Sequence, residues 1–202
     1  SSRPKSPAWR RRGPPPSAMA ADAPAEGAAS GGRPARLVAI LGSREIHRAQ
    51  SSRLCRALGQ ALAQLPGVVL VTGGCPGIQE AVARSFLRSG GLRVLHLGTP
   101  GIAPLGFGEW RVAGNTFAEN RAELAAAADA YVVVEGGPGT VQVAEGALQR
   151  GAAVVCLAAS GGAAGGKFWM PAGALRRPGE VSPALWDMLT GADAEAAAHA
   201  AA

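Results

Sequence analysis

The chain has 202 residues, of which 48% are hydrophobic, and this fits one domain with a sizeable core and some tail. Its longest apolar runs are far shorter than the ~20 residues that a membrane-spanning helix needs, so we expect a soluble protein. The formal net charge of +6 would point to a nucleic-acid or membrane partner only if the basic residues belonged to the folded part.

Residues 1–36 hold most of that charge, in a segment rich in Pro, Ala, Gly, Ser and Arg. Seven basic and two acidic residues give the segment a net charge of +5 and leave +1 for the remainder, which argues against a nucleic-acid partner. With almost no large aliphatic side chains, the segment is interpreted as disordered. A transit peptide is one alternative, and an extension foreign to the native protein, with Met19 as the true start, is another.

Five short apolar runs predict strands buried on both faces of a parallel sheet, because they are nearly uniformly apolar and often β-branched. These strands are Leu37–Leu41, Val68–Val71, Leu92–Leu97, Ala130–Val134 and Ala153–Leu157.

Stretches with helical spacing of apolar residues lie between these runs. The alternation of strands and helices predicts an α/β fold, a Rossmann-like doubly wound parallel sheet of at least five strands flanked by helices. We expect this domain to span residues 37–190, followed by an Ala-rich tail at 191–202. The helices are Gln50–Gln64, Ile78–Arg88, Thr116–Ala127, Val141–Arg150 and Pro183–Leu189.

Glycine-rich turns follow the predicted strands, at the sheet edge where such folds bind ligands. Two of them, at 72–77 and 135–140, lead directly into helices, whose free N–H groups and dipole favour an anion. The alternative is that glycine only makes tight turns. The pattern predicts a phosphate site formed by Gly42, Ser43, Thr72, Gly73, Gly74, Gly77, Gly136, Gly137, Gly139 and Thr140.

Three segments, 73–78, 115–129 and 136–140, resemble the LOG ("Lonely Guy") family within the SLOG superfamily. The resemblance covers roughly residues 37–157, and its most specific piece is the Gly-Gly-x-Gly-Thr turn at 136–140. It implies a Rossmann-like fold, usually dimeric, that binds nucleoside monophosphates or related nucleotides. The best-known activity of the family releases a cytokinin base from a riboside 5′-monophosphate by cleaving the N-glycosidic bond. Molybdenum cofactor carrier proteins have similar folds, and some SLOG relatives bind single-stranded DNA.

The chain departs from the catalytic pattern of the family at three positions. Glu135 replaces the usual Pro before Gly-Gly, Val143 replaces the catalytic Glu, and Asn120 replaces the catalytic Arg. Arg121 holds the neighbouring Lys position, where it either reaches a phosphate or is a solvated charge. A divergent N-glycosidase would use Glu135, the only acidic residue in the turn, together with Arg121 as its catalytic residues.

We therefore predict a LOG-like nucleotide-binding protein without standard phosphoribohydrolase catalysis, acting as a carrier or sensor of a phosphorylated ligand. Asn120 is included among the nucleotide-binding residues because of its place in the family pattern. Alternatives are a divergent nucleoside 5′-monophosphate phosphoribohydrolase of the cytokinin type and a molybdenum cofactor carrier-like protein. The partners expected are a nucleotide-type small molecule and a second copy of the chain.

Three widely spaced cysteines, without a Cys/His ligand pattern, argue against a metal site and favour a reduced, cytoplasmic setting. A transit peptide in residues 1–36 would make the location organellar instead. We expect no cofactor. Lys167, Arg176 and Arg177 follow the glycine-rich loop 161–166 and are candidates for a lid over an anionic ligand, or for a solvated surface.

Overall fold

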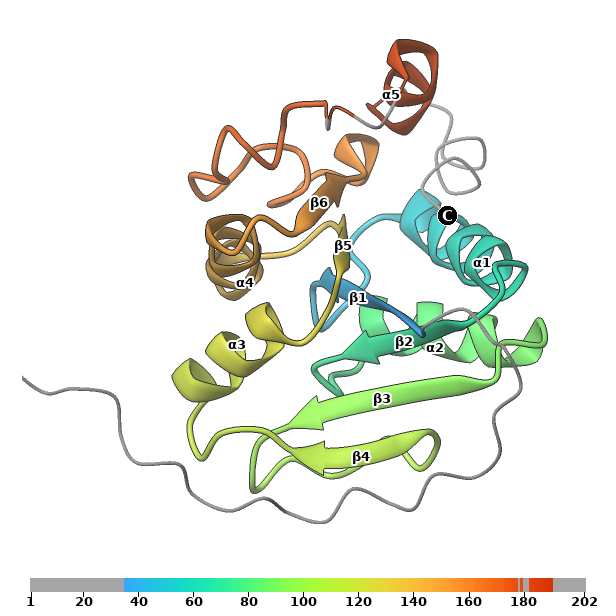
Figure 1. The fold of residues 1–202 in the computed structure, drawn as a ribbon, viewed down its shortest axis with the longest axis vertical. Coiled ribbons are helices and arrows are strands. Elements are labelled where there is room, and N and C mark those ends of the chain that lie inside the picture. Colours follow the sequence, from blue (N-terminus) through green and yellow to red (C-terminus); the bar gives the residue numbers. More distant parts are fainter. Residues whose placement is uncertain (1–34, 178, 180–181, 191–202) are drawn as a thin grey trace, which may run out of the picture. The chain divides into compact units, whose positions relative to one another are not determined.

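A computed structural model describes residues 35–177, 179 and 182–190, and the predicted tail at 191–202 lies outside this part (Figure 1). Six parallel strands form a sheet in the order β4-β3-β2-β1-β5-β6, which confirms the predicted Rossmann-like fold. The first strand begins one residue before the predicted domain boundary. The strands are β1 (Arg36–Gly42), β2 (Val68–Thr72), β3 (Arg93–Gly98), β4 (Glu109–Val112), β5 (Ala130–Val134) and β6 (Ala153–Cys156).

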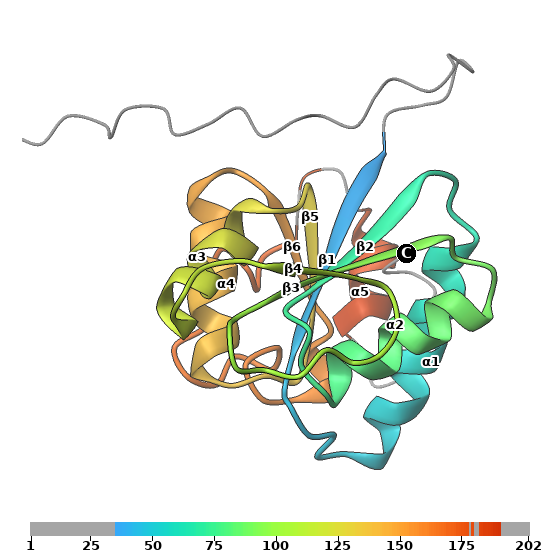
Figure 2. The same ribbon diagram turned by 90° about the horizontal axis from the view of Figure 1, so that it is seen from below.

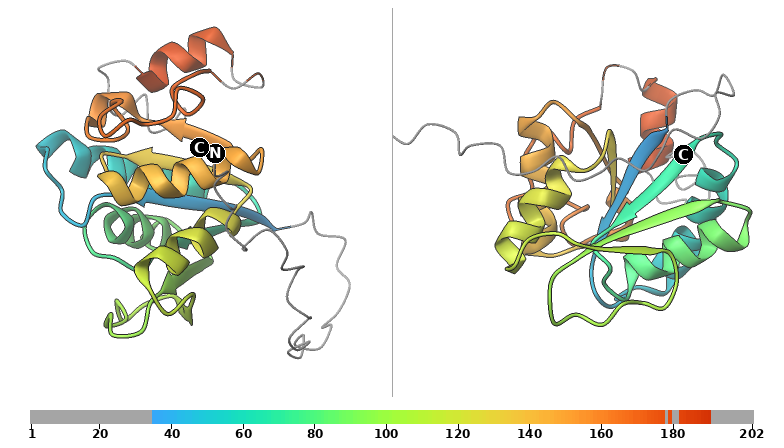
Figure 3. Two further views of the ribbon diagram at one scale, coloured as in Figure 1. Left: turned by 90° about the vertical axis from the view of Figure 1, so that its left-hand side faces the viewer. Right: turned by 60° about the horizontal axis from the view of Figure 1, so that its bottom comes forward.

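Helices cover both faces of the sheet (Figures 2 and 3). Helices α1 (Ala49–Ala63) and α2 (Ile78–Arg88) lie on one face, and α3 (Phe117–Ala126) and α4 (Pro138–Gln149) lie on the other. A short 3-10 helix, η1 (Ala158–Ser160), and α5 (Pro183–Thr190) follow β6. No helix in the described part of the chain has the length and apolar character needed to cross a membrane.

The core consists of two layers, one on each side of the sheet, because successive residues of a strand point to opposite faces. In β1, Ile40 packs in the layer of α1 and α2, and Leu41 packs in the layer of α3 and α4. Every residue of β2 is buried, which explains why its sequence is a continuous apolar run.

Strand β4 was not predicted, because its sequence Glu-Trp-Arg-Val has no apolar run and its edge position leaves it largely exposed. Glu109 of β4 forms an ion pair with Arg93 of β3, with a distance of 2.6 Å between Oε1 and Nε. The predicted start of β3 was one residue early, since Leu92 lies outside the strand and is 94% exposed.

The strand order reverses beside β1. The chain proceeds outward through β2, β3 and β4, and then returns through α3 to place β5 on the other side of β1. In open α/β sheets such a reversal leaves a crevice at the carboxyl ends of the two central strands, which is where ligands bind. Gly42 ends β1 at this point, and a Cβ there would lie 2.5 Å from Ile78 Cγ2 and 2.6 Å from the Val134 carbonyl oxygen.

We predict that Gly42→Ala lowers the free energy of unfolding by about 1–3 kcal/mol, because the methyl group overpacks the junction of β1, β5 and α2. Urea denaturation of the purified protein measures this. Gly173→Ala is the matched control, because a Cβ at Gly173 would meet its nearest neighbour, Leu148, at an ordinary 3.6 Å. Equal stability of Gly42→Ala and the control would contradict the packing argument.

Candidate functional site

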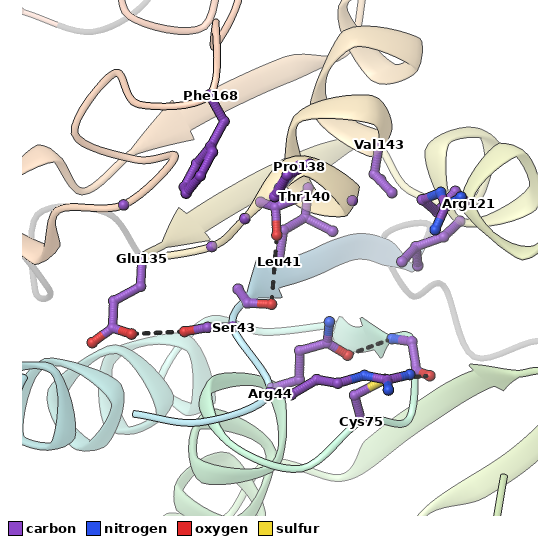
Figure 4. A pocket seen from close by; sticks show the side chains of 18 of the residues that line it. Leu41, Ser43, Arg44, Cys75, Arg121, Glu135, Pro138, Thr140, Val143 and Phe168 are labelled. Atoms are coloured by element: carbon purple, nitrogen blue, oxygen red, sulfur yellow. Dashed lines mark hydrogen bonds between the residues drawn. The ribbon is translucent and has the colours of Figure 1, made fainter. Parts of the chain in front are cut away.

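A cavity of about 610 Å³ opens at the carboxyl ends of β1 and β5, and its size is typical of small-molecule sites, which span ~300–1,000 Å³ (Figure 4). Three of the predicted binding residues lie outside its lining: Thr72 at the end of β2, and Gly74 and Gly77 in the segment between β2 and α2. The other predicted site residues all line it: Gly42, Ser43, Gly73, Asn120, Arg121, Glu135, Gly136, Gly137, Gly139 and Thr140.

The N-terminus of α4 offers two unpaired backbone donors at the cavity. The helix begins at Pro138, and its N-cap residue Gly137 provides no side-chain cap. The Thr140 amide donates to the Gly137 carbonyl at 3.0 Å, whereas the amides of Gly137 and Gly139 have no partner within the described residues. Unpaired amides at a helix N-terminus favour an anion, because the helix dipole is positive there.

Glycine is required in the turn that leads into α4. Gly136 has a φ of 94°, and a Cβ at this position would lie 2.7 Å from Thr140 Cγ2. The Thr140 hydroxyl approaches the Gly42 carbonyl at 3.5 Å, a weak contact that leaves it near the cavity surface.

The turn after β2 is different, because its own side chains use its amides. The Gly73 amide donates to Gln79 Oε1 at 2.8 Å, and the Gly74 amide donates to Thr72 Oγ1 at 3.0 Å. Thr72 Oγ1 also lies 2.6 Å from Nδ1 of His96, whose pKa is lowered by burial. Gly73 therefore contributes surface to the cavity, and neither of these two amides is available to a ligand.

Asn120 is a buried structural residue. Its Nδ2 donates to the carbonyl oxygens of Leu97 and Ala113, at 2.8 and 3.0 Å. These bonds join α3 to the end of β3 and to the segment after β4. The side-chain amide nitrogen of Asn120 thus already donates both of its hydrogen bonds within the protein. This weakens the prediction that Asn120 binds the ligand.

Glu135 is 2% exposed, and its carboxylate points toward the segment between β1 and α1 (Figure 4). Its Oε2 accepts hydrogen bonds from Ser43 Oγ at 2.7 Å and from the His47 amide at 3.1 Å, and its Oε1 accepts from the Arg48 amide at 3.1 Å. Helix α1 begins directly after Arg48, which has no side-chain cap of its own. Glu135, which directly follows β5, therefore supplies the carboxylate that the N-terminus of α1 lacks.

Burial raises the pKa of the Glu135 carboxyl, but the hydrogen bonds from Ser43 and from the amides of His47 and Arg48 outweigh it and lower the pKa below its ordinary value. Glu135 is consequently ionised at neutral pH. A general acid needs the opposite shift, so this carboxyl is poorly suited to protonate a leaving group.

Four cationic side chains line the cavity, and none of them has a carboxylate partner in the described part of the chain. The guanidinium carbon of Arg44 lies 5.2 Å above the centre of the Phe117 ring, and Arg48 donates to the Ala159 carbonyl at 3.2 Å. Arg121 lies beside the N-terminus of α4, since a Cβ at Gly139 would be 3.8 Å from its Nη1. Lys167 is the fourth cation. Glu135 is the only acidic residue among the described residues of the lining, so the cavity attracts anions.

A family model described as the SLOG cluster4 family matches residues 35–169, which is more than half of the chain. The chain belongs to this family. The match covers the whole sheet and extends through the segment that carries Lys167 and Phe168. No curated protein sequence is significantly similar to the chain.

Solved structures share the fold of this SLOG family member. The protein TM1055 is 27% identical, with a TM-score of 0.57, and the alignment covers 64% of this chain and 78% of TM1055. A molybdenum cofactor carrier protein from Chlamydomonas reinhardtii is 24% identical, with a TM-score of 0.50 and coverage of 60% and 75%. The molybdenum cofactor binding protein from Rippkaea orientalis is 21% identical, with a TM-score of 0.51 and coverage of 60% and 75%. At these identities the last two show the fold alone.

Several lining residues of this family member were missed by sequence reasoning. Arg44 directly follows a strand-end turn, which is a usable signal. Arg48 and Phe168 carry no such signal, because their positions depend on how the β1–α1 segment and the loop after β6 fold back. Of the three predicted lid cations, Lys167 lines the cavity, whereas Arg176 and Arg177 do not.

We predict that Glu135→Gln lowers the free energy of unfolding by about 2 kcal/mol, because it weakens hydrogen bonds to a charged, buried acceptor. Urea denaturation at pH 7 measures the change. Glu145→Gln is the control, since Glu145 is exposed on α4 and outside the cavity lining. If the two substitutions had equal effects, the Glu135 carboxylate would not be the cap of α1.

The pH dependence of stability follows from the same carboxylate. Because the folded pKa is lowered, its contribution is complete above the unfolded pKa of about 4.3 and is lost as pH falls through the folded value. We therefore expect the stability gap between the natural protein and Glu135→Gln to narrow from pH 7 to pH 3. Urea midpoints at the two pH values measure it, and a constant gap would contradict the assignment.

Proposed function

We propose that the cavity binds a small molecule carrying a phosphate group, of the nucleoside-monophosphate type, and that the protein is a carrier or sensor of this ligand. The observation that carries the proposal is the convergence of Arg121 with the unpaired amides of Gly137 and Gly139. A guanidinium beside free helix N-terminal amides is a combination suited to phosphate oxygens. Arg44 and Lys167 extend the positive lining beyond this point.

The side chains that line the cavity support binding of the ligand without cleavage of an N-glycosidic bond. Cleavage develops positive charge on the ribose and needs a carboxylate near it. Among the lining residues that the structure describes, Glu135 is the only acidic one, and its oxygens accept hydrogen bonds from Ser43, His47 and Arg48. Val143, at the position where the LOG pattern carries its catalytic Glu, gives the lining an apolar side chain instead.

A phosphate-bearing pterin is a second ligand class, suggested by the fold shared with molybdenum cofactor carrier proteins. Fold alone does not assign a ligand, and such a compound would use the same anion site. The homodimer and the cytoplasmic location also stay predictions. Analytical ultracentrifugation of the full chain tests directly whether it forms a dimer.

We predict that the full chain binds adenosine monophosphate and that Arg121→Met weakens the binding about tenfold, because a charge-assisted hydrogen bond to phosphate is lost. Isothermal titration calorimetry measures the affinity, and chromatography of the same mixtures follows free adenine. Arg53→Met is the matched control, since it removes an arginine from an exposed position of α1 outside the lining. We expect the control to bind as the natural protein does, with no adenine released.

Two results would overturn the proposal in different ways. No binding of adenosine monophosphate or inorganic phosphate at millimolar concentration would remove the phosphate site. Release of adenine would show an enzyme instead of a carrier, and abolition of that release by Glu135→Gln would assign the divergent N-glycosidase.

A further inference from the structure

Two consecutive bulky residues, Phe168 and Trp169, adopt the left-handed backbone conformation, with φ values of 61° and 57°. Within the described residues only one other non-glycine residue, Glu135, has a positive φ. This conformation is uncommon for side chains larger than Asn or Asp, and it persists only where the surroundings enforce it. Strained residues of this kind concentrate at binding sites.

Hydrogen bonds to the start of the anion site hold this loop in place. The amides of Ala163 and Ala164 donate to the carbonyl oxygens of Gly136 and Glu135, both at 2.9 Å. The Lys167 amide then donates back to the Gly162 carbonyl at 3.0 Å, which closes the turn immediately before Phe168. The position of Phe168 is therefore fixed relative to the turn that leads into α4.

The two aromatic side chains of the loop have different surroundings. Phe168 lines the cavity and is 43% exposed, and its ring points toward the carboxyl end of β5 (Figure 4). Trp169 is 94% exposed and does not line the cavity. A ring that is almost half exposed adds little to the core, so core packing does not account for a strained backbone that turns Phe168 into a cationic cavity.

We propose that Phe168 recognises the ring of the ligand by stacking, and that the ligand is a phosphate-bearing planar heterocycle. This inference rests on the proposed function, because the phosphate must occupy the N-terminus of α4 to bring the ring beside Phe168. The face of an aromatic side chain suits any flat conjugated ring, and stacking of this kind tolerates several bases. Phe168 is then a specificity residue that selects for a heterocycle over a bare sugar phosphate.

Calorimetric titration of the full chain with adenosine monophosphate and with ribose 5-phosphate tests the stacking, because the two ligands share the phosphate and sugar and differ in the base. We expect the natural protein to prefer adenosine monophosphate about 5- to 150-fold, the range typical of base stacking on an aromatic side chain. Phe168→Leu keeps the apolar bulk and should lose most of this preference, with unchanged affinity for ribose 5-phosphate.

Two variants make the comparison specific. Phe168→Tyr keeps an aromatic face and should keep the preference. Trp169→Leu removes an aromatic ring from the adjacent left-handed position, outside the cavity, and should also keep it. Circular dichroism and melting temperature confirm that each variant is folded before titration.

The outcomes separate this inference from the proposed function. Equal affinity of the natural protein for both ligands, or a preference that survives Phe168→Leu, would overturn the stacking role and leave the phosphate site standing. Loss of the preference in Trp169→Leu as well would show that the loop conformation matters, and not the Phe168 ring. Failure of both ligands to bind would overturn the proposed function and the stacking role together.

Discussion

Within the described part of the chain, the carboxylate of Glu135 accepts its hydrogen bonds from uncharged groups, and the electrostatics of the cavity depend on the nature of these partners. A buried charge is costly unless hydrogen bonds replace its hydration. Here the Ser43 hydroxyl and the amides of His47 and Arg48 do so, at the positive end of α1. No cation is needed to compensate Glu135. Within the described residues, Arg44 and Arg121 therefore have no carboxylate partner and are available to an anionic ligand.

The order of the strands in the sheet determines where the N-termini of α1 and α4 meet. Since β5 lies beside β1, the segment that leads into α1 and the turn that leads into α4 meet at the carboxyl ends of these two strands. The two helix N-termini have different roles there. The N-terminus of α1 is neutralised by Glu135, whereas at the N-terminus of α4 the amides of Gly137 and Gly139 have no partner among the residues that the structure describes. Only the second offers its dipole to a ligand.

Sequence patterns predicted those parts of the fold that depend on repeated or local features of the sequence. Uniformly apolar runs predicted the buried strands, and the glycines after β5 predicted the turn that lies beside the cavity. Strand β4 was not predicted, because an edge strand such as Glu109–Val112 needs no apolar run. The turn after β2 looked equivalent to the one after β5. It differs because Gln79 and Thr72 bond its amides, and such side-chain bonds leave no trace in residue spacing. Phe168 depends on bonds to residues about thirty positions earlier, which no local pattern reports.

Glu135 occupies the position at which the LOG pattern has Pro, and it connects two parts of the cavity wall. Proline fixes φ near −65°, whereas Glu135 has a φ of 54°, so the backbone here follows a path closed to Pro. Its side chain holds the β1–α1 segment, its amide donates to Ser160 Oγ at 2.7 Å, and its carbonyl accepts from Ala164 in the loop of Phe168. One strained residue thus positions the wall that carries Arg44 and the loop that carries the aromatic ring. Because Ser43, His47 and Arg48 bond its oxygens, Glu135 shapes this end of the cavity without adding a free carboxylate to it, and this supports the proposed binding without cleavage.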